Sequence, residues 1–233
     1  MVEITIAGPG RNALGTGVME GLLAQLERAG REPVLLTGAG GAFSAGLDLK
    51  EVAALDRPGM ERFLTLLERL IERLYCHPGP TVACLEGHAI AGGCVLTLCC
   101  DHRVAAARPE IRIGLNEVAL GLEFPPKLFQ VVRRRVAPRS LERVLLEAGL
   151  YDPQTAYGFG LIDEVADDAR AVATARLERL AAHPRGAFEA TKRLLRGTAL
   201  PLGPEDERRF RDELVPAWCA PEVKARVRAV LKR

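Results

Sequence analysis

The chain reads Gly87-His88-Ala89-Ile90-Ala91-Gly92-Gly93 between a strand-like segment at residues 81–85 and an apolar run at residues 95–100. Adjacent glycines at the start of a helix leave backbone N–H groups uncovered by side chains, and the helix dipole adds partial positive charge there. The segment therefore predicts a site for a developing oxyanion. A second interpretation stays open, because the two glycines would equally allow the helix to pack closely against the strand.

Another glycine-rich turn, Gly38-Ala39-Gly40-Gly41-Ala42-Phe43, follows the strand-like segment at residues 33–37. It fails as a dinucleotide fingerprint, because Phe43 stands where a third glycine must let the helix approach the strand. Residues 42–46 also resemble the nucleophile elbow of serine hydrolases, but the sequence places no histidine and acid beside Ser44. A tight connection is the remaining interpretation.

A third segment, Ile113-Gly114-Leu115-Asn116-Glu117-Val118-Ala119-Leu120-Gly121, holds a single carboxylate within an apolar stretch. Ionising a carboxyl group in apolar surroundings is costly, so burial raises its pKa toward the range of a general base. Glu117 is therefore a candidate catalytic residue. The alternative is a glutamate at a strand end that is exposed or salt-bridged.

Strand-like and helix-like segments alternate through the first half of the chain. Strands are expected at residues 4–6, 33–37, 81–85 and 103–106, and a further strand at residues 161–165. The apolar residues Phe63, Leu66, Leu67, Leu70, Ile71 and Leu74 fall on one face of a helix. Beyond residue 126 the pattern is mainly helical, with a final helical stretch at residues 205–233 whose end is basic on one face.

The composition is typical of one ordinary folded domain. The 233 residues carry 32 Lys plus Arg and 30 Asp plus Glu, a net charge of +2 that gives little support for a nucleic-acid or membrane partner. No apolar run approaches the roughly 20 residues of a membrane span. Because no export signal is visible at the start, we expect a cytoplasmic protein.

The six cysteines and four histidines show no spacing typical of a metal site. We expect the cysteines to be small buried hydrophobic residues. The sequence thus predicts neither a metal nor a redox cofactor.

Taken together, the motifs resemble the crotonase family, also called the enoyl-CoA hydratase/isomerase family. Four matching stretches occur in the family's order and spacing, at residues 42–50, 87–94, 100–105 and 113–121. A weaker likeness runs from Asn12-Ala13-Leu14 through residues 156–165 to the helical tail, so it covers nearly the whole chain.

The resemblance implies an α/β fold, a crotonase-like spiral of ββα units at residues 1–190. It also implies a helical C-terminal region at residues 191–233 that builds homotrimers or homohexamers. The expected substrate is an acyl-CoA thioester of the kind used in fatty acid metabolism, with no cofactor beyond the CoA moiety. Asp101 and Arg103 are expected to form a buried structural pair.

The resemblance also assigns candidate site residues. The backbone N–H groups of Leu47 and Gly92 would hold the thioester oxygen as it becomes negative, a kind of contact typically worth about 3 to 4 kcal/mol per donor. Arg11 and Lys50 would meet the CoA phosphates. The substrate-binding residues implied are Ala45, Leu47, Asp48, Leu49, Lys50 and Gly92.

The acid set distinguishes members of this family. Hydratases carry a second glutamate at the position of Val95, and valine neither activates water nor transfers a proton. A single carboxylate is enough for an isomerase, in which Glu117 takes a proton from C2 of a 3-enoyl-CoA and returns it at C4. The sequence therefore favours the Δ3,Δ2-enoyl-CoA isomerase branch.

Alternatives remain at this stage. Glu123 is six residues after Glu117 and would restore a water-handling pair if it faced the same cavity, as in a hydratase; a decarboxylase is a further possibility. A protein of another class would bind acyl-CoA or RNA without turnover. Phe124, Leu128 and Phe129 are expected to line the acyl pocket or the core.

Overall fold

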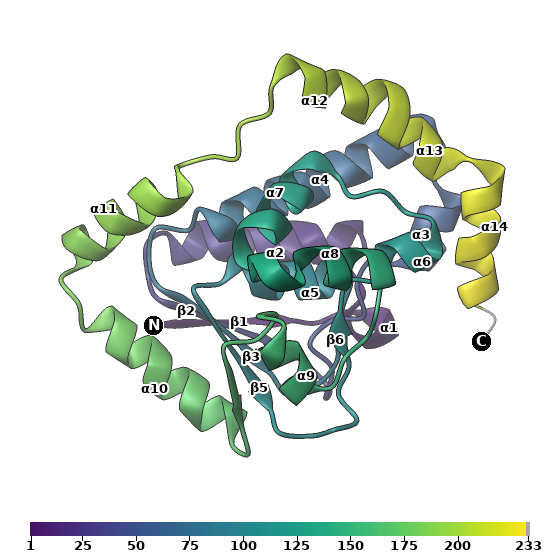
Figure 1. Cartoon of the computed structure of the whole chain (residues 1–233). Coiled ribbons are helices and arrows are strands. Elements are labelled where there is room, and N and C mark those ends of the chain that lie inside the picture. Colours follow the sequence, from purple (N-terminus) through teal and green to yellow (C-terminus); the bar gives the residue numbers. More distant parts are fainter. Residues whose placement is uncertain (232–233) are drawn as a thin grey trace.

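A five-stranded parallel sheet forms the centre of the protein, whose computed structural model describes residues 1–231 (Figure 1). Its strands, in spatial order, are β1 (Val2–Ile6), β2 (Val34–Gly38), β3 (Thr81–Leu85), β5 (His102–Ala106) and β7 (Glu164–Ala166). The first four confirm the predicted strands. The fifth begins later than predicted, because the Leu161 N–H bonds to Ala156 O at the end of α9 (Pro153–Gly158) and not to a neighbouring strand.

A second, two-stranded parallel sheet pairs β4 (Ala89–Ile90) with β6 (Ile113–Gly114). Isolated bridges extend it to Ser44 on one side and to Tyr151 on the other. The chain thus passes from β3 to β4 to helix α5 (Gly92–Cys99), and again from β5 to β6 to helix α6 (Glu117–Leu120). This arrangement is the predicted spiral of ββα units, and it aligns the three motifs at one edge.

Helices cover both faces of the main sheet. On one side lie α2 (Thr16–Ala29), α4 (Arg57–Tyr75) and α7 (Pro126–Arg135), and on the other lies α10 (Ala169–Ala181), which packs on β3 and β5. Five of the six residues in the predicted apolar stripe of α4 are buried, and Leu66 is half-buried. The smaller helices are α1 (Pro9–Asn12), α3 (Leu49–Ala54) and α8 (Pro138–Glu147).

The C-terminal region leaves the sheet layer and returns across the helices. It comprises α11 (Arg185–Arg196), α12 (Pro204–Arg209), one π-helical turn (Phe210–Leu214), α13 (Val215–Cys219) and α14 (Pro221–Val230). The predicted boundary between residues 190 and 191 falls inside α11. The predicted continuous helix at residues 205–233 is broken before Pro221, and its last residues, 232 and 233, lie outside the described part of the chain.

Within residues 1–231, no helix combines the length and hydropathy that crossing a bilayer requires. Helix α13 packs on α4, and α14 packs on α3 and α6 (Figure 1). The C-terminal region therefore covers the motif-bearing edge of its own chain.

The predicted pair of Asp101 and Arg103 is wrong. Arg103 binds Asp163 at 2.6 Å, because β5 and the turn before β7 are neighbours, whereas Asp101 binds Lys192 at 2.7 Å and Arg196 at 2.8 Å. Arg196 also donates to Cys99 O at 2.7 Å, at the C-terminal end of α5. Cations are favourable at this negative end of a helix dipole.

Candidate active site

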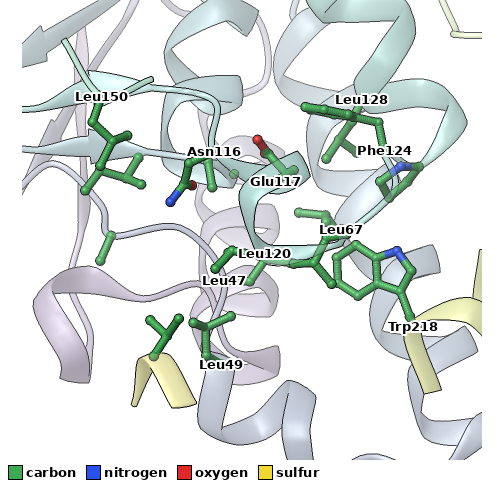
Figure 2. A pocket seen from close by; sticks show the side chains of 17 residues that line it. Leu47, Leu49, Leu67, Asn116, Glu117, Leu120, Phe124, Leu128, Leu150 and Trp218 are labelled. Atoms are coloured by element: carbon green, nitrogen blue, oxygen red, sulfur yellow. The ribbon is translucent and has the colours of Figure 1, made fainter. Parts of the chain in front are cut away.

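An apolar cavity of about 200 Å³ lies where the three sequence motifs meet (Figure 2). Each motif contributes lining residues, and the rest come from α4, α7, α13, α14 and the segments around them. Glu117 carries the only ionisable side chain among the described lining residues. The lining residues are Ala45, Leu47, Leu49, Leu67, Ile90, Ala91, Gly92, Asn116, Glu117, Leu120, Leu122, Phe124, Pro125, Leu128, Leu150, Trp218 and Val230.

The backbone around Gly46 presents the N–H of Leu47. Gly46 has φ +90°, and a Cβ atom there would approach Ile90 O to 2.8 Å, so the position requires glycine. Leu14 N–H donates to Gly46 O at 2.7 Å, whereas Leu47 N–H donates no hydrogen bond within residues 1–231. That N–H group is thus available to an incoming acceptor.

Ser44 is a structural residue of the same turn. Its hydroxyl is fully buried and donates to Asn12 O at 2.8 Å, and it accepts a hydrogen bond from Gly46 N–H at 3.2 Å. The serine-hydrolase interpretation is wrong, because this hydroxyl holds the loop together and is closed off from the surface.

Gly92 is the first residue of α5, and its N–H has no helical partner. The preceding Ala91 has φ 49° and ψ −122°, an unusual conformation for a non-glycine residue, and ψ of Ala91 sets the direction of the Gly92 N–H. Two hydrogen bonds hold this conformation: Ala91 N–H donates to Gly114 O at 2.8 Å, and Val95 N–H donates to Ala91 O at 3.0 Å.

The two interpretations of Gly92-Gly93 apply to different residues. A Cβ atom at Gly93 would lie 2.5 Å from Ser44 O, so this glycine permits close packing. At Gly92 the nearest atoms are flexible side-chain ends of Leu47 and Leu14, at 3.3 and 3.4 Å, and the residue lines the cavity.

Glu117 begins α6 and is 6% exposed. Burial raises the pKa of its carboxyl to about 8, and within the described residues its Oε2 atom has no hydrogen-bond partner. The neighbouring Asn116 Oδ1 is also buried and unpartnered there. Unsatisfied buried polar atoms are rare in native proteins, and here both residues line one cavity, ready for a polar ligand.

Residues 1–213 match the family described as enoyl-CoA hydratase/isomerase. The chain belongs to the enoyl-CoA hydratase/isomerase family. A putative enoyl-CoA hydratase of Thermus thermophilus is 36% identical over 219 residues, which cover 89% of this chain and 84% of that protein. The predicted family, and with it the prediction of an enzyme, is confirmed.

Two further similarities involve isomerases of this family. The human mitochondrial enoyl-CoA delta isomerase 1 is 31% identical over 195 residues, 81% of this chain and 65% of that protein. The chain thus spans just under two thirds of that relative's length. The crystal structure of human mitochondrial delta3-delta2-enoyl-CoA isomerase superimposes with a TM-score of 0.89 and 26% identity, covering 99% of this chain and 92% of that one. The crotonase-like fold is therefore confirmed.

The structure brings together five of the predicted site residues of this family member, namely Ala45, Leu47, Leu49, Gly92 and Glu117. Four others, Asp48, Glu123, Arg11 and Lys50, lie outside the cavity wall. Asp48 caps α3, accepting from Lys50 N–H at 2.9 Å and Glu51 N–H at 3.2 Å, so its carboxylate has a structural partner. Arg11 and Lys50 are exposed, and their contact with CoA phosphates stays a prediction.

Glu123 is not brought into the site. Leu122, Phe124 and Pro125 line the cavity, whereas the intervening Glu123 points away, exposed, with its Oε2 3.5 Å from Arg209 Nη2. Successive side chains of an extended segment face opposite sides, which explains the difference from the prediction. Glu117 and Glu123 therefore do not form a pair of acids in the cavity.

The acyl-pocket residues were predicted in part. Phe124 and Leu128 line the cavity as expected, whereas Phe129 is 40% exposed and lies outside it. Asn116 and Trp218 were missed. Trp218 is the only tryptophan in the chain, and a large aromatic residue within a charged helical tail was the available signal. Among the described residues, no cluster of three or more histidine, cysteine or acidic side chains is arranged for a metal ion.

Proposed function

We propose that the protein is an enoyl-CoA isomerase that converts a 3-enoyl-CoA into the 2-enoyl-CoA. Glu117, as the carboxylate, removes a proton from C2. The C3–C4 double bond then becomes part of a dienolate whose negative charge lies on the thioester oxygen. Glu117 returns the proton to C4, the double bond now joins C2 and C3, and the carboxylate is restored.

The N–H groups of Leu47 and Gly92 are the proposed donors to that oxygen. Donors fixed in a water-poor site stabilise a charge that develops in the transition state more than they stabilise the ground state. Their orientation by Gly46 and Ala91 supports this role, because backbone hydrogen bonds within the protein hold both residues in place.

One observation carries the choice of isomerisation over hydration: Glu117 is the single ionisable side chain in the described cavity wall. Hydration needs a group that activates water in addition to a proton donor, and Val95 and Glu123 supply none in this cavity. The carboxyl group would work alone, and an apolar wall would keep water from the dienolate.

The substrate is proposed to be an acyl-CoA thioester, with its CoA portion leaving the cavity along Ala45 to Lys50 and its phosphates near Arg11 and Lys50. Exposed cations are suited to a coenzyme that carries several phosphates. The proposed reaction uses no cofactor other than CoA itself, which is part of the substrate.

We further propose that the protein assembles as a homotrimer or homohexamer. The adjacent Leu194 and Leu195 on α11 are 87% and 77% exposed, which is unusual for large apolar side chains unless a surface covers them. Sedimentation at equilibrium tests this assembly, and a monomer would contradict it. The cytoplasmic location stays a prediction.

The test of the reaction compares wild type with Glu117→Gln on 3-enoyl-CoA and 2-enoyl-CoA substrates. Wild type should isomerise the first and show little hydration of the second, and Glu117→Gln should lose isomerisation because an amide takes no proton. Retained isomerisation in the variant would remove Glu117 as the base. Efficient hydration by wild type would favour a hydratase.

A further inference from the structure

Trp218 forms part of one end of the cavity. It is 2% exposed, and its Nε1–H donates to Glu123 O at 3.1 Å. Figure 2 shows Trp218, Phe124 and Leu128 on one side of Glu117, and Asn116 and Leu150 on the other. The indole is therefore held in place at an apolar end of the site, away from the polar amide of Asn116.

The C-terminal segment fixes this indole by its local helix geometry. The π-helical turn Phe210–Leu214 precedes α13, with Val215 N–H donating to Phe210 O. A π-turn adds a residue to one helical turn, so it rotates the following helix relative to an uninterrupted one. In that register Trp218 faces the cavity, and α13 packs on α4, which supplies Leu67 to the same wall.

The cavity is small for a fatty acyl chain. Its volume of about 200 Å³ is below the roughly 300 to 1,000 Å³ of typical small-molecule pockets. The thioester group takes part of that space, which leaves room for only a short chain. Protein interiors are close-packed, so a longer acyl chain would have to displace the side chains that line the cavity.

We propose that Trp218 closes the acyl end of the cavity and limits the substrates to acyl-CoA thioesters with short chains. This inference rests on the proposed binding of acyl-CoA and adds a specificity-determining residue to it. The indole sets the limit through its size, and its bond to Glu123 O keeps it from swinging aside.

The test measures kcat/KM for 3-hexenoyl-CoA and 3-dodecenoyl-CoA in wild type, Trp218→Phe and Trp218→Leu. Wild type should prefer the shorter substrate by about tenfold or more, and Trp218→Leu should reduce that preference by about tenfold. Trp218→Phe, which retains a smaller ring, should fall between them, and it serves as the second variant should Trp218→Leu fold poorly.

Val223→Ala is the matched control. Val223 is buried in α14 of the same C-terminal region but lies outside the cavity wall and the π-helical turn, so its replacement should lower stability without changing the preference for chain length. Equal kcat/KM values for both substrates in wild type, or an unchanged preference in both Trp218 variants, would overturn the inference.

Binding of saturated hexanoyl-CoA and dodecanoyl-CoA, measured by calorimetry, separates this inference from the proposed reaction. Selective binding of hexanoyl-CoA that Trp218→Leu relaxes, in a protein with no isomerase activity, supports the chain-length limit and contradicts the reaction. Isomerisation of both substrates with similar kcat/KM supports the proposed reaction and contradicts the chain-length limit. Binding of neither thioester overturns both.

Discussion

Gly46 lies against the backbone nitrogen of Gly92: a Cβ atom at residue 46 would be 3.5 Å from that nitrogen. The two segments that present the proposed donor N–H groups are far apart in sequence and meet at this contact. A change in one segment is therefore expected to displace the other.

Gly46→Ala is expected to lower kcat by about 100-fold, the typical effect of losing one oxyanion donor. The added methyl group meets Ile90 O at 2.8 Å, so the backbone on either side must move. Gly41→Ala is the control, because Gly41 has a similar φ of +77° with no atom within 4 Å of the added carbon. Steady-state kinetics on a 3-enoyl-CoA would compare the two, and equal losses would contradict the expectation.

The pH dependence of kcat/KM should follow the ionisation of Glu117. Burial raises the pKa of this carboxyl to about 8, and only the carboxylate acts as a base. The rate should therefore increase with pH and level off above about 8, since kcat/KM reports the free enzyme. Initial rates measured across neutral and mildly alkaline pH would reveal this increase. A rate independent of pH over that range would argue against Glu117 as the base.

Glu117→Gln should make the protein more stable at alkaline pH. The folded pKa of about 8 is above the ordinary 4.5, so between these values the folded state retains a proton that the unfolded state has released. Increasing pH through this window therefore favours unfolding of wild type, whereas a neutral glutamine has no such dependence.

Thermal unfolding of both proteins would measure that difference. The Tm advantage of Glu117→Gln should be largest above pH 8 and should shrink as pH falls toward 4.5. An advantage that stays constant over the window would mean that Glu117 does not titrate in it.

The local sequence predicted most of the regular structure and the centre of the site. Continuous apolar runs and the α4 stripe identify strands and a helix, because their periodicity reflects burial on one or both faces. Gly92 and Glu117 stand out because each residue type is unusual in its setting. A single sequence therefore suffices where the signal lies within a few neighbouring residues.

What the sequence did not reveal depends on contacts between distant segments. The partner of Arg103 is Asp163, and Trp218 approaches Phe124 and Leu67 only through the fold. The sequence left the orientation of Glu123 open, because one residue of shift in an extended segment reverses the side that a side chain faces. The sequence pointed to Glu117, Phe124 and Leu128 but not to Asn116 or Trp218, which line the same cavity.

Arg196→Met is expected to destabilise the fold strongly. Arg196 is buried, binds Asp101 at 2.8 Å and donates to Tyr75 O at 3.0 Å and Cys99 O at 2.7 Å. The variant leaves the buried carbonyl groups of Tyr75 and Cys99 without their donor, and each unsatisfied buried polar group typically costs about 1 to 3 kcal/mol. Urea denaturation would measure the change in the free energy of unfolding.

Arg193→Met on the same helix provides the comparison, because Arg193 is exposed and the same substitution there should change stability by about 0.5 kcal/mol or less. Lys192 remains beside Asp101 in both variants, so the difference reports the Arg196 contacts. Those contacts tie α11 to the C-terminal end of α5, whose first residue is Gly92. A similar loss of unfolding free energy in both variants would contradict this expectation, because the contacts of Arg196 with α5 would then contribute no more than an exposed arginine of α11.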